Sequence, residues 1–197
     1  MEEFKKLDEI CQPDSRQAFF VRSDPSSPDG FRATTIQDIY KAVESIRLHE
    51  GVPEKVRSHF ETARNLALYA WFFYPFNVTA HLSAYTSIEY ALRTKSDDRK
   101  TAFKQLLRNA VDNGWIKDHG FSIPSQRVER IRERNAEMPA EFQEPEPSLM
   151  RDYCDVLCES IPFLRNQLAH GSSMLHGDGI GPIRIAAELI NQLFIGP

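Results

Sequence analysis

The chain has 197 residues, of which 41% are hydrophobic and 26% are charged, and its formal net charge is -4. A chain of this length and composition can bury a sizeable core, so a single globular unit is expected. The slightly acidic balance excludes the general basic character by which many proteins bind nucleic acid over a broad surface. The three cysteines form no disulfide framework and are typical of a reducing compartment.

Two further absences favour a cytoplasmic protein without a membrane partner. No apolar run in the sequence reaches the length that a membrane-spanning helix needs. Acidic and basic residues follow Met1, where a secretory signal peptide would place a short basic stretch and then an apolar one.

Residues 1–52 predict a helical extension that packs on a larger helical bundle. Residues 2–12 have apolar side chains at helical spacing and predict a short helix. Residues 18–21 suit a short extended piece, and residues 22–30 are rich in Ser, Pro, Asp and Gly, as loops are. A helix with a regular apolar stripe is expected over residues 35–51.

Residues 53–197 predict the bundle itself. Helices are expected from Pro53 to Pro75, over 77–93, over 99–113, over 125–135, from Ser148 to Gly171, and over 183–194. Three prolines among glutamates make 136–147 an expected acidic mobile loop, and 172–181 an expected glycine-rich loop.

The stretch of greatest chemical interest runs from Arg165 to Gly171 and reads Arg-Asn-Gln-Leu-Ala-His-Gly. It lies in an apolar periodic segment, so a helix is expected. Gly171 suits the left-handed residue that follows a helix, because glycine has no Cβ to clash there. His170 would then lie in the last turn, where the helix dipole favours a cation and an imidazole titrates near neutral pH.

The spacing also assigns faces to this helix. Four leucine and isoleucine side chains form the expected core stripe: Leu157, Ile161, Leu164 and Leu168. Four polar side chains point away from that core, toward water or another helix: Asp155, Glu159, Asn166 and His170. Arg165 lies at the flank of the polar face.

Glu89 falls within the apolar stripe of the helix expected over 77–93, and a carboxylate there needs a partner because burying it unpaired is costly. Two partners are open. The first is Arg93, its i+4 neighbour at the helix edge. The second is Arg165 or His170, which Glu89 would hold in place.

A basic segment is followed by an acidic one in the middle of the chain. Residues 95–134 contain ten Lys/Arg and six Asp/Glu, a balance of plus four, whereas 135–160 contain one Arg and seven Asp/Glu, a balance of minus six. Four arginines gather in the helix expected over 125–135 and are candidates for RNA contacts: Arg127, Arg130, Arg132 and Arg134. The alternative is a solvated helix whose charges pair with one another.

Other candidates for chemistry are weaker. Cys154 and Cys158 lie one helical turn apart, but no second pair of metal ligands follows, so both are expected at the edge of the core. His176 is either a second proton donor or a plain loop histidine. No carboxylate-rich cluster suggests a metal site, and no metal or cofactor is expected.

The pattern Arg165-Asn166, three residues, His170 resembles the defining motif of the HEPN family, the higher eukaryotes and prokaryotes nucleotide-binding domains. In that family an Arg, a polar residue directly after it and a His a few residues on mark the active site. The segment from Ile88 to Arg93 and the helix after Gly171 are also similar. The resemblance covers roughly residues 53–195 as a helical arrangement.

This resemblance implies an all-α, HEPN-like antiparallel bundle with additional N-terminal helices, paired through a two-fold axis. Many members are metal-independent endoribonucleases, and others only bind RNA, nucleotides or proteins. The first expectation is therefore an endoribonuclease that cleaves RNA through 2′-hydroxyl attack as a homodimer. Its catalytic residues would be Arg165, His170 and Asn166, with Glu89 in support.

Further partners follow from the same resemblance. A cognate inhibitor protein or a nucleotidyltransferase would accompany the enzyme, as in toxin–antitoxin or antiviral systems. The second expectation is a non-catalytic HEPN-like module that binds RNA, a nucleotide or a protein through the same cleft. The third is an unrelated helical protein in which the motif arose by chance.

Overall fold

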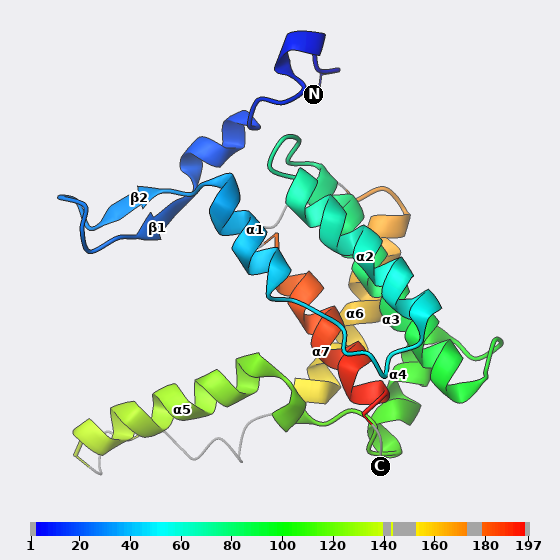
Figure 1. Cartoon of the computed structure of the whole chain (residues 1–197). Helices are drawn as coiled ribbons and strands as arrows, with labels where there is room; N and C mark the ends of the chain where they lie inside the picture. The colour runs from blue at the N-terminus through cyan, green and yellow to red at the C-terminus, as the bar shows by residue number, and fades with distance from the viewer. Residues whose placement is uncertain (1–2, 140–142, 144–152, 173–178, 196–197) are drawn as a thin grey trace.

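The computed structural model describes residues 3–139, 143, 153–172 and 179–195, and only the backbone of residues 125, 127 and 128. Within these residues the protein is mostly helical, with seven α-helices packed together and a small two-stranded hairpin (Figure 1). None of the helices so described has the length and apolar character needed to cross a membrane.

The regular elements begin with short pieces and continue with the helices. The short pieces are the 3-10 turns η1 (Leu7–Glu9), η2 (Ser15–Phe19) and η3 (Asp118–Gly120) and the strands β1 (Val21–Ser23) and β2 (Phe31–Ala33). The helices are α1 (Ile36–Glu44), α2 (Glu54–Tyr69), α3 (Phe76–Ser96), α4 (Phe103–Asp112), α5 (Ser122–Glu137), α6 (Tyr153–Ala169) and α7 (Gly181–Leu193).

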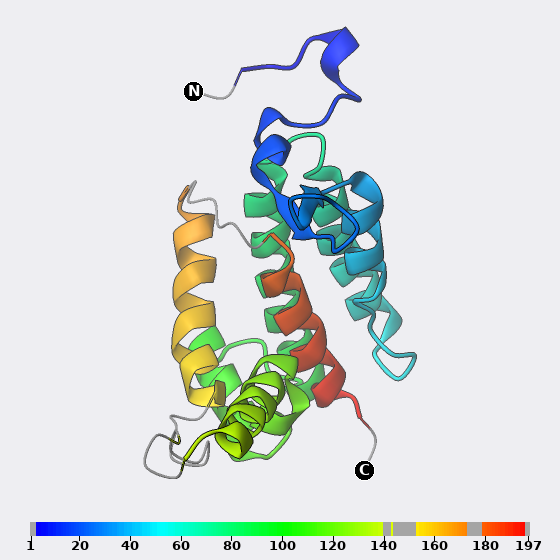
Figure 2. The same ribbon diagram turned by 90° about the vertical axis from the view of Figure 1, so that its left-hand side faces the viewer.

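The central element is α3, which packs against α2, α4, α6 and α7. Small side chains recur along it and are fully buried, among them Ala80, Ala84 and Ala91. Because alanine adds little bulk, neighbouring helices can approach α3 closely, and larger side chains such as Ile88 and Leu92 fill the remaining space. Figure 2 shows α6 as an outer helix along one side of this arrangement.

The sequence pattern predicted α3, α4 and α7 well. Four apolar side chains of α4 recur at helical spacing and are buried: Phe103, Leu106, Leu107 and Ala110. Gly114 follows α4 with a φ of +68°, as expected of a residue that ends a helix. The last helix is broadly apolar and seals the core, with six buried side chains.

The prediction for residues 2–12 was wrong. Only the single turn η1 forms there, and the Phe4 and Leu7 side chains are 100% and 87% exposed. A short helix gains too few hydrogen bonds to offset its nucleation cost unless its apolar face is buried. The loop expected over 22–30 proved to be part of a hairpin, in which Val21 pairs with Ala33 and Ser23 with Phe31.

Two predicted helices were too long. The helix expected over 35–51 ends at Glu44, where the Ser45 hydroxyl donates to Ala42 O at 2.8 Å and Arg47 Nε donates to Glu44 O at 2.9 Å. These side chains satisfy carbonyls that a longer helix would have used. The helix expected to reach Pro75 ends at Tyr69, so Trp71 lies in the turn before α3 and is half-buried.

Asp14 explains how the N-terminal segment is attached at this turn. Its backbone N–H donates to Trp71 O at 2.9 Å, and its carboxylate accepts from the Tyr74 backbone N–H at 2.8 Å. The Arg16 guanidinium pairs with the same carboxylate, with Nε 2.8 Å from Oδ1. Burial alone raises the pKa of Asp14, but the hydrogen bonds from Arg16 and Tyr74 outweigh it and hold the pKa below its usual value.

We expect the Asp14→Ala substitution to lower the free energy of unfolding by about 1–3 kcal/mol at pH 7, because the buried Tyr74 N–H loses its acceptor. The pKa of Asp14 is lower in the folded state than in the unfolded state, where it is about 4. Ionised Asp14 therefore stabilises the fold fully at pH values above about 4, and this stabilisation is lost as the pH falls through the folded-state pKa. The gap between wild type and variant in urea unfolding should therefore narrow from pH 7 to pH 3. Asp29→Ala, in the exposed hairpin loop, is the control, and an equal effect of both would contradict the prediction.

Candidate functional site

The C-terminal end of α6 forms as the sequence predicted. The Gly171 N–H donates to Leu168 O at 3.2 Å and the Ser172 N–H donates to Gln167 O at 3.0 Å. Gly171 has a φ of +90°, which glycine accepts without strain. These two bonds are the Schellman arrangement, and they place His170 at the C-cap of α6.

The core stripe of α6 is confirmed. Leu157 and Ile161 are buried, and Leu164 and Leu168 are half-buried against the main core. The polar face divides into two parts. At the start of the helix it meets another helix, because Asp155 pairs with Arg108 of α4, and Glu159 lies 2.5 Å from the Lys104 ammonium of the same helix.

The second part of the polar face, at the end of the helix, is exposed. Asn166 and His170 are exposed there, as is Phe163, whose side chain is 60% exposed. The His170 ring makes no hydrogen bond or ion pair with another described residue, so its two nitrogens are available to solvent or to a ligand.

Glu89 of α3 joins the two arginines that the sequence offered as alternatives. Its Oε1 accepts from Arg93 Nη2 at 2.7 Å, and its Oε2 accepts from Arg165 Nη2 at 3.0 Å. The Glu89 side chain is 16% exposed, against 25% for Arg93 and 32% for Arg165. Both expected partners are therefore present at once, and His170 is not one of them.

Arg93 and Arg165 differ in how many of their N–H groups remain available to a further acceptor. Arg93 Nη1 also donates to the Asp98 and Thr101 carbonyls at 3.3 and 3.2 Å, so it ties the end of α3 to the next segment. Arg165 Nη1 donates to Asn166 Oδ1 at 3.2 Å, and Arg165 Nε is buried without a partner among the described residues. Since a guanidinium has five N–H groups, each terminal nitrogen of Arg165 keeps one for another acceptor.

The electrostatics of this cluster favour an anion. One carboxylate faces two permanently charged guanidinium groups, which leaves one positive charge in excess. Arg165 is the more exposed of the two cations, and its fork suits carboxylate or phosphate oxygens. Asn166 supports Arg165 rather than His170, which differs from a role in orienting the imidazole.

The arginine-rich helix α5 does not lie near the cluster of Glu89, Arg93 and Arg165. Arg130 and Arg132 are exposed on α5, and the backbones of Arg127 and Arg134 lie in the same helix. Both views place α5 beside the end at which α6 begins, away from the end at which α6 stops (Figures 1 and 2). RNA contacts by these arginines would therefore require a ligand that extends along the length of α6.

The remaining candidates are structural or lie outside the described residues. Cys154 and Cys158 are buried within the core rather than at its edge, and burial raises the pKa of the Cys158 thiol. Among the described residues, no group of three or more His, Cys, Asp or Glu side chains is placed to hold a metal ion. His176, Ser148 and most of the acidic loop over 136–147 lie outside the described part.

No protein-family model, no curated protein and no solved structure matches this chain significantly. The fold and the site therefore define a mostly helical protein, with seven described helices and a small hairpin. Its distinguishing polar feature is a carboxylate of α3 that holds an arginine of α6 one turn before an exposed histidine.

The shared carboxylate leads to a test by double-mutant cycles. We expect Glu89→Ala to lower the free energy of unfolding by about 1–3 kcal/mol, because it leaves two half-buried guanidinium groups without their acceptor. Cycles that combine Glu89→Ala with Arg93→Ala and with Arg165→Ala should each show a coupling of about 0.5 kcal/mol or more in urea unfolding.

Glu133→Ala, an exposed glutamate of α5, is the matched control and should be nearly neutral. Zero coupling between Glu89 and Arg165 would show that their contact does not stabilise the fold.

Proposed function

We propose that this protein is a HEPN-like, metal-independent endoribonuclease that acts as a homodimer. The observation that supports it most is the fixed position of Arg165, held by Glu89 and Asn166 one turn before the exposed His170. A preorganised cation and a free imidazole at one helix end are the two groups that cleavage of RNA requires without a metal.

The chemistry starts from a nucleophile that RNA itself carries. An imidazole takes the proton of the 2′-hydroxyl, whose oxygen then attacks the adjacent phosphorus. The bond from phosphorus to the 5′-oxygen breaks, and that oxygen receives a proton from an acid. His170 is the group that performs proton transfer, and in a two-fold pair the partner's His170 supplies the second one.

Arg165 stabilises the charge that develops on the phosphoryl oxygens. Its contact with Glu89 restricts the rotamers of a long side chain before substrate arrives, so less conformational entropy is lost on binding. The remaining N–H groups of the two terminal nitrogens can reach a phosphate in the planar geometry that two oxygens favour.

The outer face of α6 supports the proposed pairing. Phe163 is 60% exposed and Val156 is 38% exposed on the side that carries Asn166 and His170. Neither α2 nor α7 packs extensively on α6, whose main contacts are with α3 and α4. A two-fold contact through this face would bury the apolar side chains and bring two sets of Arg165 and His170 into one cleft.

We expect a two-fold dimer in solution at micromolar concentration, and we expect Phe163→Glu to convert it to a monomer by placing a charge in the contact. Sedimentation velocity measures both states. Phe31→Glu is the matched control, since Phe31 is 59% exposed on the hairpin and should leave the dimer intact. A monomeric wild type would count against the proposal.

A second function, a non-catalytic binding module, is favoured by one observation. His170 has no described partner that would fix its tautomer or orientation, whereas catalytic histidines are usually held by a second group. In that case Arg165 would bind a phosphate or another anion without turnover, and RNA would be retained intact.

Cleavage ends distinguish the two functions. We expect RNA incubated with the protein and a chelator to yield fragments with a 2′,3′-cyclic phosphate, or its hydrolysis product, and a free 5′-hydroxyl. DNA should resist, because it lacks the 2′-hydroxyl. His170→Ala should lower the rate by about 10²–10⁴-fold, since it removes the proton-transfer group.

Arg165→Lys should also impair cleavage, because an ammonium cannot bind two phosphate oxygens as a planar fork does. Asn166→Ala should be milder, since it removes a support of Arg165 and no charge. Circular dichroism checks folding of each variant. Cleavage that survives His170→Ala, or that requires magnesium and leaves a 5′-phosphate, would show that this chemistry is wrong.

A further inference from the structure

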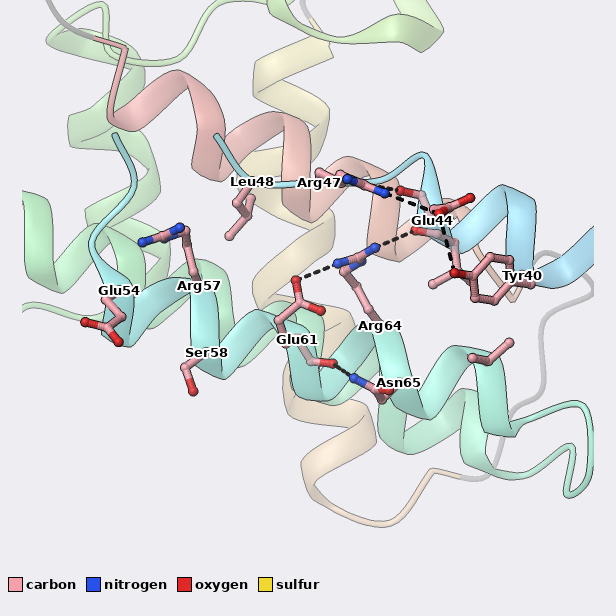
Figure 3. A pocket seen from close by; sticks show the side chains of 12 residues that line it. Tyr40, Glu44, Arg47, Leu48, Glu54, Arg57, Ser58, Glu61, Arg64 and Asn65 are labelled. Carbon is pink, nitrogen blue, oxygen red and sulfur yellow. Dashed lines mark hydrogen bonds and ion pairs between the residues drawn. The ribbon is translucent and has the colours of Figure 1, made fainter. Parts of the chain in front are cut away.

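A second polar site shares no residue with the cluster of Glu89, Arg165 and His170. A groove of about 600 Å³ is lined by α1, the segment that follows it and α2, none of which carries Glu89, Arg165 or His170 (Figure 3). Its volume is in the range of sites that hold small organic ligands. Charged side chains line it together with a few apolar ones, and they come from opposite walls.

Arg57 is the unusual residue of this groove. Glu54 precedes it by three positions on α2 and Glu61 follows by four, which are the spacings of helical ion pairs. The Arg57 side chain nonetheless makes no ion pair or hydrogen bond within the described part of the chain, and its Nε is buried without a partner there. Figure 3 draws its side chain extending from α2, and no dashed line joins it to Glu54 or Glu61.

Such a donor needs an acceptor. A buried N–H without a hydrogen bond costs free energy, and native structures supply nearly all such groups with a protein, water or ligand partner. A guanidinium with every N–H unused offers its full planar fork, which suits the two oxygens of a carboxylate or of a phosphate monoester.

The two neighbouring arginines differ from Arg57 because their terminal nitrogens already have protein acceptors, although Arg64 Nε, like Arg57 Nε, is buried without one among the described residues. Arg64 Nη1 lies 2.5 Å from Glu61 Oε1, and Arg64 Nη2 donates to Val43 O at 3.2 Å. Arg47 Nη2 lies 3.3 Å from Glu44 Oε1. The hydrogen bond from Arg64 to Val43 joins the two walls, whereas the two ion pairs each lie within one wall. Arg57 is the arginine of the groove whose side chain has no described acceptor.

The charge balance limits the size of the ligand. Three arginines and three glutamates line the groove, so its net charge is zero: Arg47, Arg57, Arg64, Glu44, Glu54 and Glu61. A neutral groove exerts little long-range attraction and would repel parts of a polyanion that approach its carboxylates. This excludes nucleic acid as the occupant and favours a small molecule with one oxyanion.

The apolar lining indicates the rest of the ligand. Val43 is buried, and Leu48 and Leu68 are half-buried at the groove wall. A hydrocarbon portion of a ligand that packs beside these side chains would be removed from water, which is favourable. The lining therefore favours a ligand that carries a hydrocarbon portion next to its anionic group.

We infer that this groove is a binding site for a small organic oxyanion, a carboxylate or a phosphate monoester that carries an apolar portion, with Arg57 as its principal contact. This site is independent of the proposed ribonuclease function, and neither depends on the other.

Ligand binding in the groove is measured by nuclear magnetic resonance. Acetate, benzoate, inorganic phosphate and phenyl phosphate are titrated at constant ionic strength against chloride, and the Arg57 Nε–H signal and the backbone amides of Leu48 and Asn65 are observed. We expect saturable shifts with benzoate or phenyl phosphate, and at least about threefold weaker binding of the ion that lacks the ring. The comparison of the two aromatic probes decides between carboxylate and phosphate.

Variants show whether Arg57 carries the binding. Arg57→Gln should weaken the binding seen at the Leu48 and Asn65 amides by about tenfold or more, and Arg57→Lys should restore only part of it. Arg99→Gln is the matched control, because Arg99 is exposed and lies outside the groove. Shifts no larger than those in chloride, or equal binding by Arg57→Gln, would overturn the inference, and RNA cleavage by Arg57→Gln should remain unchanged in either case.

Discussion

The carboxylate of Glu89 is the contact on which the position of the candidate site depends. It accepts hydrogen bonds from Arg93 of its own helix and from Arg165 of α6, and all three side chains are half-buried. α6 is an outer helix that relies on α3 and α4 for its contacts. Apolar packing holds its inner stripe and ion pairs with α4 hold its beginning, so Glu89 supplies the polar attachment near its end.

The accuracy of sequence-based prediction varied along the chain for a physical reason. The helices α4 and α7 carry strong apolar periodicity, and their buried faces made them predictable. The N-terminal segment has no such face, and its structure is set by distant contacts such as that of Asp14 with Tyr74. That hydrogen bond joins residues sixty positions apart and leaves no mark in local spacing, so the attachment of the N-terminal segment could not be predicted. The short hairpin was missed because its two strands are exposed and have no buried face to show as a pattern. The end of α1 was placed too late because it depends on side-chain hydrogen bonds to carbonyls, which apolar spacing does not indicate.

The candidate site was predictable to a similar degree. The glycine after His170 predicted where α6 ends, and the apolar stripe predicted which face of α6 packs on the core. The shared use of Glu89 was not predictable, because spacing indicates neighbours but does not show that two carboxylate oxygens serve two cations. Arg57 could not be singled out from the sequence, because Glu54 and Glu61 lie at the spacings of helical ion pairs and only the structure shows that Arg57 pairs with neither.

At Gly171 the main chain, and not a side chain, supplies the hydrogen bonds that end α6. In many helices a basic side chain near the C-terminus donates to the last carbonyls and thereby becomes part of the helix end. Here the backbone amides of Gly171 and Ser172 perform that task. One glycine thus completes the end of α6 from the main chain, and the side chain of His170 can change its rotamer without breaking a hydrogen bond that holds the helix end.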